Sequence, residues 1–421
     1  MNGNRKIAIV GAGISGLTCA WLLNEKHEIT LFEANNYIGG HTNTVKVPDN
    51  GRPVPVDTGF IVFNEQNYPN LCRLFDRLGV PYQDSDMSFS VHCEESGLVY
   101  NGTSIPSLFA QKRNLLNLPF LGMLKEILHF HGKAESIINN GIDDSVTVGE
   151  FVHKQGYSDI FFKKFLVPLG ASLWSSPADR FREFPVKFVL EFLRNHSMLQ
   201  VNGRPTWKTV TGGSSRYVGE MIRPYMDRIR LNSPVKSIRR SGKQVAVVLE
   251  NNSVEYFDDV IIAAHSDQAL RMLANPDEDE QEILGAFRYE KNEVVLHTDT
   301  GLLPPVKHAW GSWNYRILED MTRPAAVTYN MNLLQSLETD QTYCVSLNQT
   351  RDIDKNRIIA SFNYSHPQFS PGRDQFQSRH QDLIRHQGIS YCGAYWGYGF
   401  HEDGVRSALA VCSEFGRGEI R

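Results

Sequence analysis

Residues 6–16 read Lys6-Ile7-Ala8-Ile9-Val10-Gly11-Ala12-Gly13-Ile14-Ser15-Gly16, a short and mostly apolar run that leads directly into a Gly-x-Gly-x-x-Gly pattern. A second such run covers 28–32 and ends on the acidic residue Glu33. Short apolar runs bounded by glycine are typical of buried strands, and the stretch between them has room for one helix. The order of strand, glycine-rich turn, helix, strand and acidic residue indicates a βαβ unit that binds a dinucleotide.

Each part of this pattern has a physical role. Gly11 permits a tight turn, Gly13 lets the backbone approach a pyrophosphate, and Gly16 lets the helix pack closely on the sheet. The N-terminus of the helix presents free N–H groups and the positive end of its dipole to the phosphates. Glu33 lies where a carboxylate can accept hydrogen bonds from a ribose. We therefore predict a bound dinucleotide; the alternative is a βαβ unit that has lost its ligand.

Two stretches beyond the βαβ unit bear on which dinucleotide is bound. Gly39-Gly40-His41-Thr42 would bring a second length of backbone against the cofactor, with the imidazole or the hydroxyl in reach of a phosphate. Gly-Gly is also common in plain turns. Residues 57–61 read Asp57-Thr58-Gly59-Phe60-Ile61. At this spacing the two stretches together resemble the FAD proteins of the flavin amine oxidase and phytoene desaturase superfamily, in which an Asp-x-Gly strand runs under the flavin ring.

Later segments extend this resemblance to nearly the whole chain. Residues 207–214 are similar to the Gly-Gly start of the second FAD-domain segment, and residues 228–238 to the strand whose valine, here Val235, meets the adenine. Residues 258–265 resemble a strand that commonly ends Ala-x-Pro, with histidine in place of the proline. Residues 389–405 resemble the final strand, loop and helix, whose N–H groups point at the flavin N1–C2=O2 edge. Negative charge develops at that edge when the ring takes up a hydride.

Four short motifs bring the match closer than the superfamily. They are Gly397–Gly404 (Gly-Tyr-Gly-Phe-His-Glu-Asp-Gly), Ser85–Val91, Arg194–His196 and Gly203–Trp207. They resemble the flavin oxidase-like domain fused to the N-terminus of plant cyclopropane fatty acid synthases, and stand-alone bacterial proteins of amine oxidase-like type. This resemblance implies chemistry on the acyl chains of membrane lipids, such as desaturation beside a methyl branch, and a lipid methyltransferase as a partner.

The resemblance implies FAD contacts in all of these segments. The expected cofactor-binding residues are Gly11, Gly13, Ile14, Ser15, Gly16, Glu33, Ala34, Gly39, Gly40, His41, Thr42, Gly59, Phe60, Ile61, Val235, Ala263, Gly393, Asp403, Gly404 and Val405. The expected residues of the catalytic loop are Tyr395, Trp396, Tyr398 and His401. The aromatic rings of this loop would form a cage for a substrate nitrogen, the wall of a tunnel for a lipid chain, or simple packing beside the cofactor.

The cofactor segments are separated in sequence, so the FAD-binding domain must be discontinuous. We expect an α/β fold class, with a Rossmann-like, glutathione reductase-type FAD-binding domain formed by residues 1–85, 205–275 and 385–421. Residues 86–204 and 276–384 are expected to form a mixed α+β substrate domain. The first of these two stretches shows mostly helical spacing of apolar residues, and the second contains strand-like runs.

The composition is that of an ordinary globular protein of two or three domains, with 421 residues, 41% hydrophobic and 21% charged. The net charge of −4 gives no indication of nucleic-acid binding. No apolar stretch is long enough to predict a transmembrane helix, and Met1-Asn2-Gly3-Asn4 lacks the layout of a signal peptide. Six scattered cysteines without a Cys-x-x-Cys pattern favour a cytoplasmic protein with no metal. The acidic run 277–280 is expected to face solvent.

The stretch 107–133 combines apolar residues at helical spacing with basic side chains. The helical positions are Phe120, Leu121, Leu124, Ile127 and Leu128, and the basic residues are Lys112, Arg113, Lys125 and Lys133. Such a stretch can lie in a bilayer interface, as an enzyme acting on phospholipid acyl chains would require. It can also be a helix pair that covers the core of the substrate domain, which is the simpler interpretation. A membrane-peripheral location depends on this choice, which the sequence leaves open.

The chemistry is constrained by one departure from the amine oxidases, many of which carry a lysine that holds a water near flavin N5. In the corresponding strand, residues 287–297, this position falls at Asn292 or Glu293, and Lys291 is out of phase. We therefore expect hydride transfer from an apolar, lipid acyl substrate to flavin N5. Oxidation of an amine, and a non-catalytic flavin-bound partner of a lipid methyltransferase, are the alternatives. Candidate bases are His401, Glu402, His196, His265 and Glu293.

Overall fold

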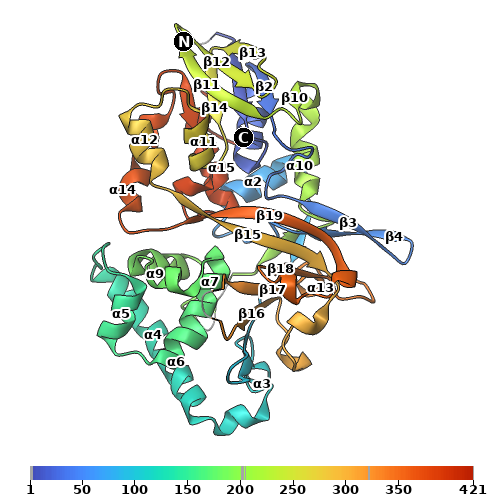
Figure 1. The fold of residues 1–421 in the computed structure, drawn as a ribbon, viewed down its shortest axis with the longest axis vertical. Coiled ribbons are helices and arrows are strands. Elements are labelled where there is room, and N and C mark those ends of the chain that lie inside the picture. Colours follow the sequence, from blue (N-terminus) through green and yellow to red (C-terminus); the bar gives the residue numbers. More distant parts are fainter. Residues whose placement is uncertain (1–2, 201–202, 204, 321–322, 421) are drawn as a thin grey trace.

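One half of the protein is built on a five-stranded parallel sheet with the order β10-β2-β1-β14-β20. The computed structural model describes residues 3–200, 203, 205–320 and 323–420, so Arg204 of the Gly203–Trp207 motif lies outside it. The strands of the sheet are β1 (Lys6–Val10), β2 (Glu28–Phe32), β10 (Ile229–Arg230), β14 (Asp259–Ile262) and β20 (Ile389–Tyr391). They come from three separated parts of the chain, and their largely buried, apolar residues are what a parallel sheet covered on both faces requires (Figure 1).

Helices cover one face of this sheet, and an antiparallel meander with two further helices covers the other. The first set is α1 (Ile14–Leu23), α2 (Pro69–Leu78), α10 (Ser215–Ile222) and α15 (His401–Ser413). The second set is β11 (Val235–Ser241), β12 (Gln244–Leu249) and β13 (Val254–Phe257), with α11 (Ser266–Met272) and α12 (Glu278–Gly285). Each side has its own cluster of buried apolar residues, and the helices on the first side bring the N-termini of α1 and α15 to the same edge of the sheet.

The other half is built on a seven-stranded mixed sheet with the order β19-β15-β18-β17-β16-β7-β8. Its strands are β7 (Phe89–Cys93), β8 (Val99–Asn101), β15 (Arg288–His297), β16 (Trp313–Ile317), β17 (Ala326–Asn330), β18 (Cys344–Leu347) and β19 (Ile358–Gln368). Its helices are α3 (Ile105–Leu108), α4 (Leu118–Asn139), α5 (Val148–Gln155), α6 (Asp159–Phe161), α7 (Val167–Trp174), α8 (Ala178–Arg182), α9 (Val186–Asn195) and α13 (Met331–Leu334). The helices and the sheet share one large apolar core.

Several short elements join the two halves. They are the hairpin β3 (Thr44–Asp49) with β4 (Arg52–Asp57), the small sheet of β5 (Val62–Phe63), β9 (Lys208–Val210) and β6 (Tyr82–Asp84), and the helix α14 (Arg373–Ser378). The long strands β15 and β19 lie between the two halves in Figure 1. Residues of β19 therefore face the parallel-sheet half, which is why this strand contributes to the site below.

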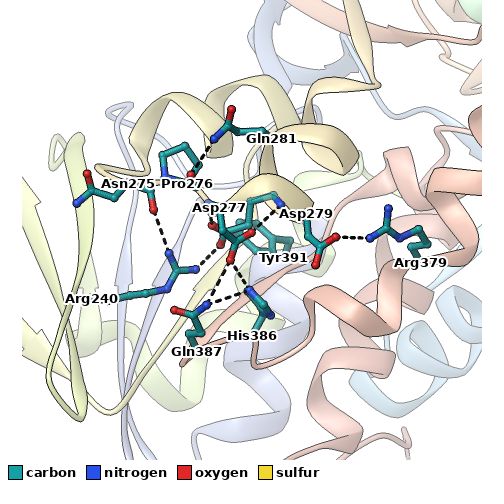
Figure 2. Close-up of polar contacts among 11 residues, drawn as sticks. Arg240, Asn275, Pro276, Asp277, Asp279, Gln281, Arg379, His386, Gln387 and Tyr391 are labelled. Carbon is teal, nitrogen blue, oxygen red and sulfur yellow. Dashed lines mark hydrogen bonds and ion pairs between the residues drawn. The ribbon is translucent and has the colours of Figure 1, made fainter.

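The acidic run 277–280 differs from the expectation that it faces solvent. Asp277 caps α12, and the Glu280 side chain that follows is fully buried. The Glu280 carboxylate accepts hydrogen bonds from Arg240 and from the hydroxyl of Tyr391, each at 2.5 Å. Figure 2 shows this network, in which α12 meets β20 and the meander. The prediction was wrong for Glu280 because its partners come from distant parts of the chain and could not be seen locally.

None of the helices in the described ranges is both long and apolar enough to cross a bilayer. All six cysteines are buried and free. Among the residues that the structure describes, no group of three or more His, Cys, Asp or Glu is arranged to hold a metal ion.

Candidate functional site

The glycine-rich turn between β1 and α1 is shaped by its neighbours. Gly11 has a φ of +103°, and a Cβ there would lie 2.6 Å from the Ala263 carbonyl oxygen. A Cβ on Gly16 would lie 1.9 Å from the Gly11 carbonyl oxygen, so helix and turn pack too closely for a side chain. A Cβ on Gly13 would meet nothing within 4 Å. Gly11 and Gly16 thus serve the fold, whereas Gly13 borders open space at the N-terminus of α1, as a phosphate requires.

Glu33 lies beside this turn at the end of β2. Its buried carboxylate accepts hydrogen bonds from the Ala12 N–H and from the backbone and side-chain nitrogens of Asn35, each at 2.8 Å. The Ser233 N–H donates to the Glu33 carbonyl at 2.8 Å and brings the start of β11, with Val235, to the same place. Ala34 is exposed next to it. The carboxylate is therefore held in place with acceptor capacity left for ribose hydroxyls.

The Gly39-Gly40 turn packs directly against the first turn. The Gly39 N–H donates to the Ala12 carbonyl at 2.9 Å, and a Cβ on Gly40 would lie 3.1 Å from the Gly13 Cα. On its other side, a Cβ on Gly59 would lie 2.0 Å from the His41 carbonyl oxygen, which accepts the N–H of the next residue, Phe60. Residues 39–42 thus lie between the Gly-x-Gly-x-x-Gly turn and the buried 57–61 stretch, which includes Ile61.

The N-terminus of α15 completes this arrangement. The Asp403 carboxylate accepts the N–H groups of Tyr398 and Phe400, both at 3.0 Å, and so caps the helix. Burial raises the pKa of Asp403 to about 6. A Cβ on Gly404 would lie 2.8 Å from Ile14 Cγ2 and 2.9 Å from Ser15 Oγ, so the first turns of α1 and α15 touch.

The residues assembled here fit FAD. Two helix N-termini, an open glycine and an organised carboxylate suit the diphosphate and the ribose of a dinucleotide. The buried Nε2 of His41 has no hydrogen-bond partner within the described chain, so it is free to meet a cofactor oxygen. Val405 is fully buried behind the α15 N-terminus, and the Gly393 N–H donates to Ser407 Oγ at 2.9 Å, which fixes the loop before it.

The aromatic side chains of the expected catalytic loop pack against different halves of the molecule. Tyr395 packs 5.1 Å from Phe287 and Trp396 packs 4.2 Å from His380, both in the apolar cluster behind the parallel sheet. Tyr398 instead stacks on Phe188 of α9 at 5.2 Å. The three rings therefore do not form one cage, and Tyr398 is the ring of the three that faces the substrate-binding half.

His401, at the first position of α15, lies against two of the residues expected to bind the cofactor, Thr42 and Phe60. Its ring stacks on Phe60 at 3.7 Å, and its Nε2 lies 3.0 Å from Thr42 Oγ1 and 3.3 Å from the Tyr217 hydroxyl. Burial lowers the pKa of His401 to about 3, so the ring is neutral near pH 7. A neutral imidazole can donate one hydrogen bond and accept one, but it cannot serve as a charged acid.

The other candidate bases are placed differently. His196 bonds to the Phe192 carbonyl at the end of α9, and His265 stacks on Tyr289 at 4.4 Å. The Glu402 carboxylate accepts the backbone N–H groups of Asn70 and Leu71 at the start of α2. Each of these three side chains is thus already held by the residues around it.

On β15, Asn292 rather than Glu293 faces inward. Asn292 is fully buried, whereas Lys291 and Glu293 are exposed, and the Glu293 carboxylate accepts the hydroxyl of Thr350. The strand therefore presents an amide, with no lysine, to the interior at this position.

Two residues of β19 that the sequence analysis missed stand beside Asn292 and His41. The Tyr364 hydroxyl lies 3.1 Å from both Thr58 Oγ1 and Asn43 Nδ2, and its ring lies 5.0 Å from that of His41. The His366 ring lies 5.4 Å from His41, and its Nδ1 lies 3.4 Å from Asn292 Nδ2. We call His41, Asn292, Tyr364 and His366 the polar seam. The alternation Phe362-x-Tyr364-x-His366 in the sequence could have indicated that these three side chains share one face of a strand.

Burial keeps the polar seam uncharged. It lowers the pKa of His366 to about 4 and that of His41 well below its usual range, with the neighbouring histidines adding to the effect at His41. Both rings are therefore neutral near pH 7.

Comparison with known proteins identifies the family. The sequence profile of the family described as flavin containing amine oxidoreductase matches residues 14–302. The L-amino-acid oxidase of Siganus canaliculatus is 22% identical over 329 residues, which are 71% of this chain and 57% of that protein. The chain thus aligns with little more than half the length of that curated relative.

Solved structures agree on the fold. Cyclohexylamine oxidase from Brevibacterium oxydans superimposes with a TM-score of 0.71 at 15% identity, covering 98% of this chain and 100% of that one. The CLA-producing fatty acid isomerase from P. acnes superimposes with a TM-score of 0.68 at 14% identity, covering 98% of both chains. These matches confirm the predicted α/β fold class of an FAD-binding domain with a mixed substrate domain. Because the family profile covers more than half of it, the chain belongs to the flavin containing amine oxidoreductases, a family of FAD-dependent oxidoreductases.

Proposed function

We propose that this protein oxidises an apolar substrate, the acyl chain of a lipid, by removing a hydride and a proton from neighbouring carbons to leave an alkene. One observation carries the proposal. The side of the substrate domain that meets the cofactor site is a wall of aromatic rings. The inward position of β15 agrees with it, because the residue there is Asn292 and not a lysine.

The aromatic wall consists of Phe188, Phe192, Phe369, Tyr398 and Phe400. Phe192 stacks on Phe400 at 5.2 Å, and Phe188 lies 4.7 Å from Phe369 and 5.2 Å from Tyr398. Phe400 is the residue before His401, so the wall borders the cofactor site directly. Rings of this kind exclude water and can pack against methylene groups. The buried guanidinium of Arg373 lies 3.6 Å from the centre of the Phe188 ring, so the wall also holds one cation.

FAD, when bound, supplies the hydride acceptor at N5. The chain itself contributes the dry environment of the aromatic wall and the neutral imidazoles of the polar seam. Because burial lowers the pKa of His41, its imidazole is a weak base, and we assign the proton that leaves with the hydride to the flavin, which would take up both hydrogens that the acyl chain loses. Similarity to the fatty acid isomerase supports the capacity of this fold to hold an acyl chain, and the resemblance to the cyclopropane fatty acid synthase domain suggests methylated or cyclopropane acyl phospholipids.

Anaerobic mixing tests this proposal. The holoprotein is incubated with methylated, cyclopropane or unmodified phospholipids, the visible flavin absorption is followed, and the acyl chains are analysed by mass spectrometry. Bleaching of the flavin with loss of two hydrogens from the acyl chain is expected. A flavin that stays oxidised with all of these lipids would refute the proposal.

Oxidation of an amine is the second candidate, and the polar seam favours it. His41, Asn292, Tyr364 and His366 offer neutral hydrogen-bonding groups to a substrate nitrogen, and cyclohexylamine oxidase has the same fold. Rapid bleaching by a panel of aliphatic and cyclic amines, with no reaction of the lipids, would establish this alternative. Reduction by neither class, with stable binding to a lipid methyltransferase, would point to a non-catalytic partner instead.

A further inference from the structure

The stretch 103–134 exposes an unusual share of the apolar surface. Ten large apolar side chains are exposed in the described chain, and five of them lie in this one stretch. These five, which we call the leucine patch, are Ile105 (75% exposed), Leu115 (54%), Leu116 (87%), Leu118 (77%) and Leu128 (62%). The other five are scattered over both halves of the molecule. Clustered exposure of this kind marks an interaction surface, whereas single exposed residues do not.

The local structure explains why these side chains are not buried. α4 turns Phe120, Met123, Phe130 and Ala134 into the substrate-domain core, so the opposite face of the helix is left outside. The short helix η1 (Lys112–Leu116) buries only Asn114, whose amide donates to the Val99 carbonyl at 2.9 Å. One face of this stretch therefore covers the core of the substrate domain, and the opposite face is exposed.

The net charge of this stretch is opposite in sign to the net charge of the whole chain. Between 103 and 134 there are four basic residues and one acidic residue, a net charge of +3 in a chain that carries −4. The single acid, Glu126, is engaged by the N–H and the hydroxyl of Ser158. Lys112, Arg113 and Lys125 are exposed among the leucines. In Figure 1, α3 and α4 lie in the lower part of the molecule, opposite the end that holds the N-terminus.

We infer that the leucine patch and its lysines dock the protein on an anionic phospholipid surface. The side chains of the leucine patch can enter the acyl region between head groups, while the lysines remain at the phosphates. A second copy of the chain fits less well, because a two-fold symmetric contact would place two surfaces of +3 charge against each other. The docking surface is independent of the chemistry proposed above, although a membrane-borne acyl substrate would give it a purpose.

Vesicle flotation with the holoprotein of residues 1–421 tests this inference. Binding is expected to phosphatidylglycerol-containing vesicles, to weaken at high salt, and to be much weaker for pure phosphatidylcholine. Leu116→Ser with Leu118→Ser should weaken binding at least about 30-fold, since each leucine gains more than about 1 kcal/mol on burial. Lys112→Gln with Lys125→Gln should weaken it about 25-fold, at about five-fold per charge. These positions are exposed, so the melting temperature should not change.

Matched controls come from the same class of residue elsewhere. Met226→Ser removes an apolar side chain that is 58% exposed in the other half, and Lys26→Gln removes an exposed lysine there. Both should bind vesicles like the wild type. Failure of the wild type to bind, or equal binding by the leucine variant, would overturn the inference. So would a wild-type dimer that the leucine variant splits without any vesicle binding. Flavin reduction by detergent-dispersed lipid is measured in parallel, so that docking and the proposed chemistry can fail separately.

Discussion

Gly13→Glu gives the sharpest test of the cofactor site, because the structure separates its effect on binding from its effect on folding. Gly13 is the N-cap of α1 in an extended conformation (φ −78°, ψ −179°) that any residue adopts, and its Cβ would point into open space. A carboxylate near a helix N-terminus is favourable, so the apoprotein should fold normally. With FAD, the carboxylate would face the diphosphate. Two like charges about 5 Å apart at an effective dielectric constant of about 20 repel by about 3 kcal/mol, or about 100-fold in affinity for each phosphate charge.

The assay is the flavin content of the purified protein, followed by fluorescence titration of the apoprotein with FAD. Gly219→Glu is the matched control, since it adds the same side chain at an exposed glycine of α10 that also has nothing within 4 Å. We expect the control to be yellow and Gly13→Glu to be colourless, with equal melting temperatures of the two apoproteins. Gly16→Ala should instead unfold the turn, because its Cβ would overlap the Gly11 carbonyl. A Gly13→Glu protein that retains FAD like the control would refute the placement of the diphosphate.

Three further predictions concern buried side chains that can ionise. Glu280→Ala removes the acceptor of the Arg240 guanidinium, the Tyr391 hydroxyl and the Asp277 N–H, and should lower the free energy of unfolding by about 3 kcal/mol in urea denaturation. The surface ion-pair variant Asp279→Ala should not, and equal losses would contradict the network of Figure 2. Burial raises the pKa of Asp403 from 3.8 to about 6, so the folded protein binds this proton more tightly than the unfolded chain does. The stability that the proton contributes is fully present below pH 3.8 and is lost as the pH rises through about 6. Relative to Asp403→Asn, the wild type should therefore lose up to about 3 kcal/mol between about pH 4 and pH 7, and a constant difference would disprove the shift. Because burial lowers the pKa of His401 to about 3, the rate of flavin reduction should show no titration of His401 above about pH 5, and an inflection that disappears in His401→Gln would contradict its burial.

The sequence predicted the parts of the site that depend on local pattern. The turn around Gly13 and the acid at Glu33 follow from steric and hydrogen-bonding needs that act within one βαβ unit. Tyr364 and His366 could not be found in this way. They reach His41 only because β19 pairs along β15 and crosses between the two halves, a contact that spans more than 300 residues of sequence. The neutral state of these rings likewise comes from burial in the assembled fold.

The buried carboxylates near the site decide which substrates it can hold. A protonated amine carries a charge that must be paired when it leaves water. Asp403 is occupied by the two N–H groups that it caps, and Asp57 by the Thr44 hydroxyl, the Ser214 N–H and hydroxyl, and the Gln335 amide. The histidines of the polar seam are neutral and offer no negative charge. An ammonium group would therefore have to lose its proton before entering, whereas an acyl chain carries no charge that needs a partner. This asymmetry is our physical reason for placing the lipid ahead of the amine.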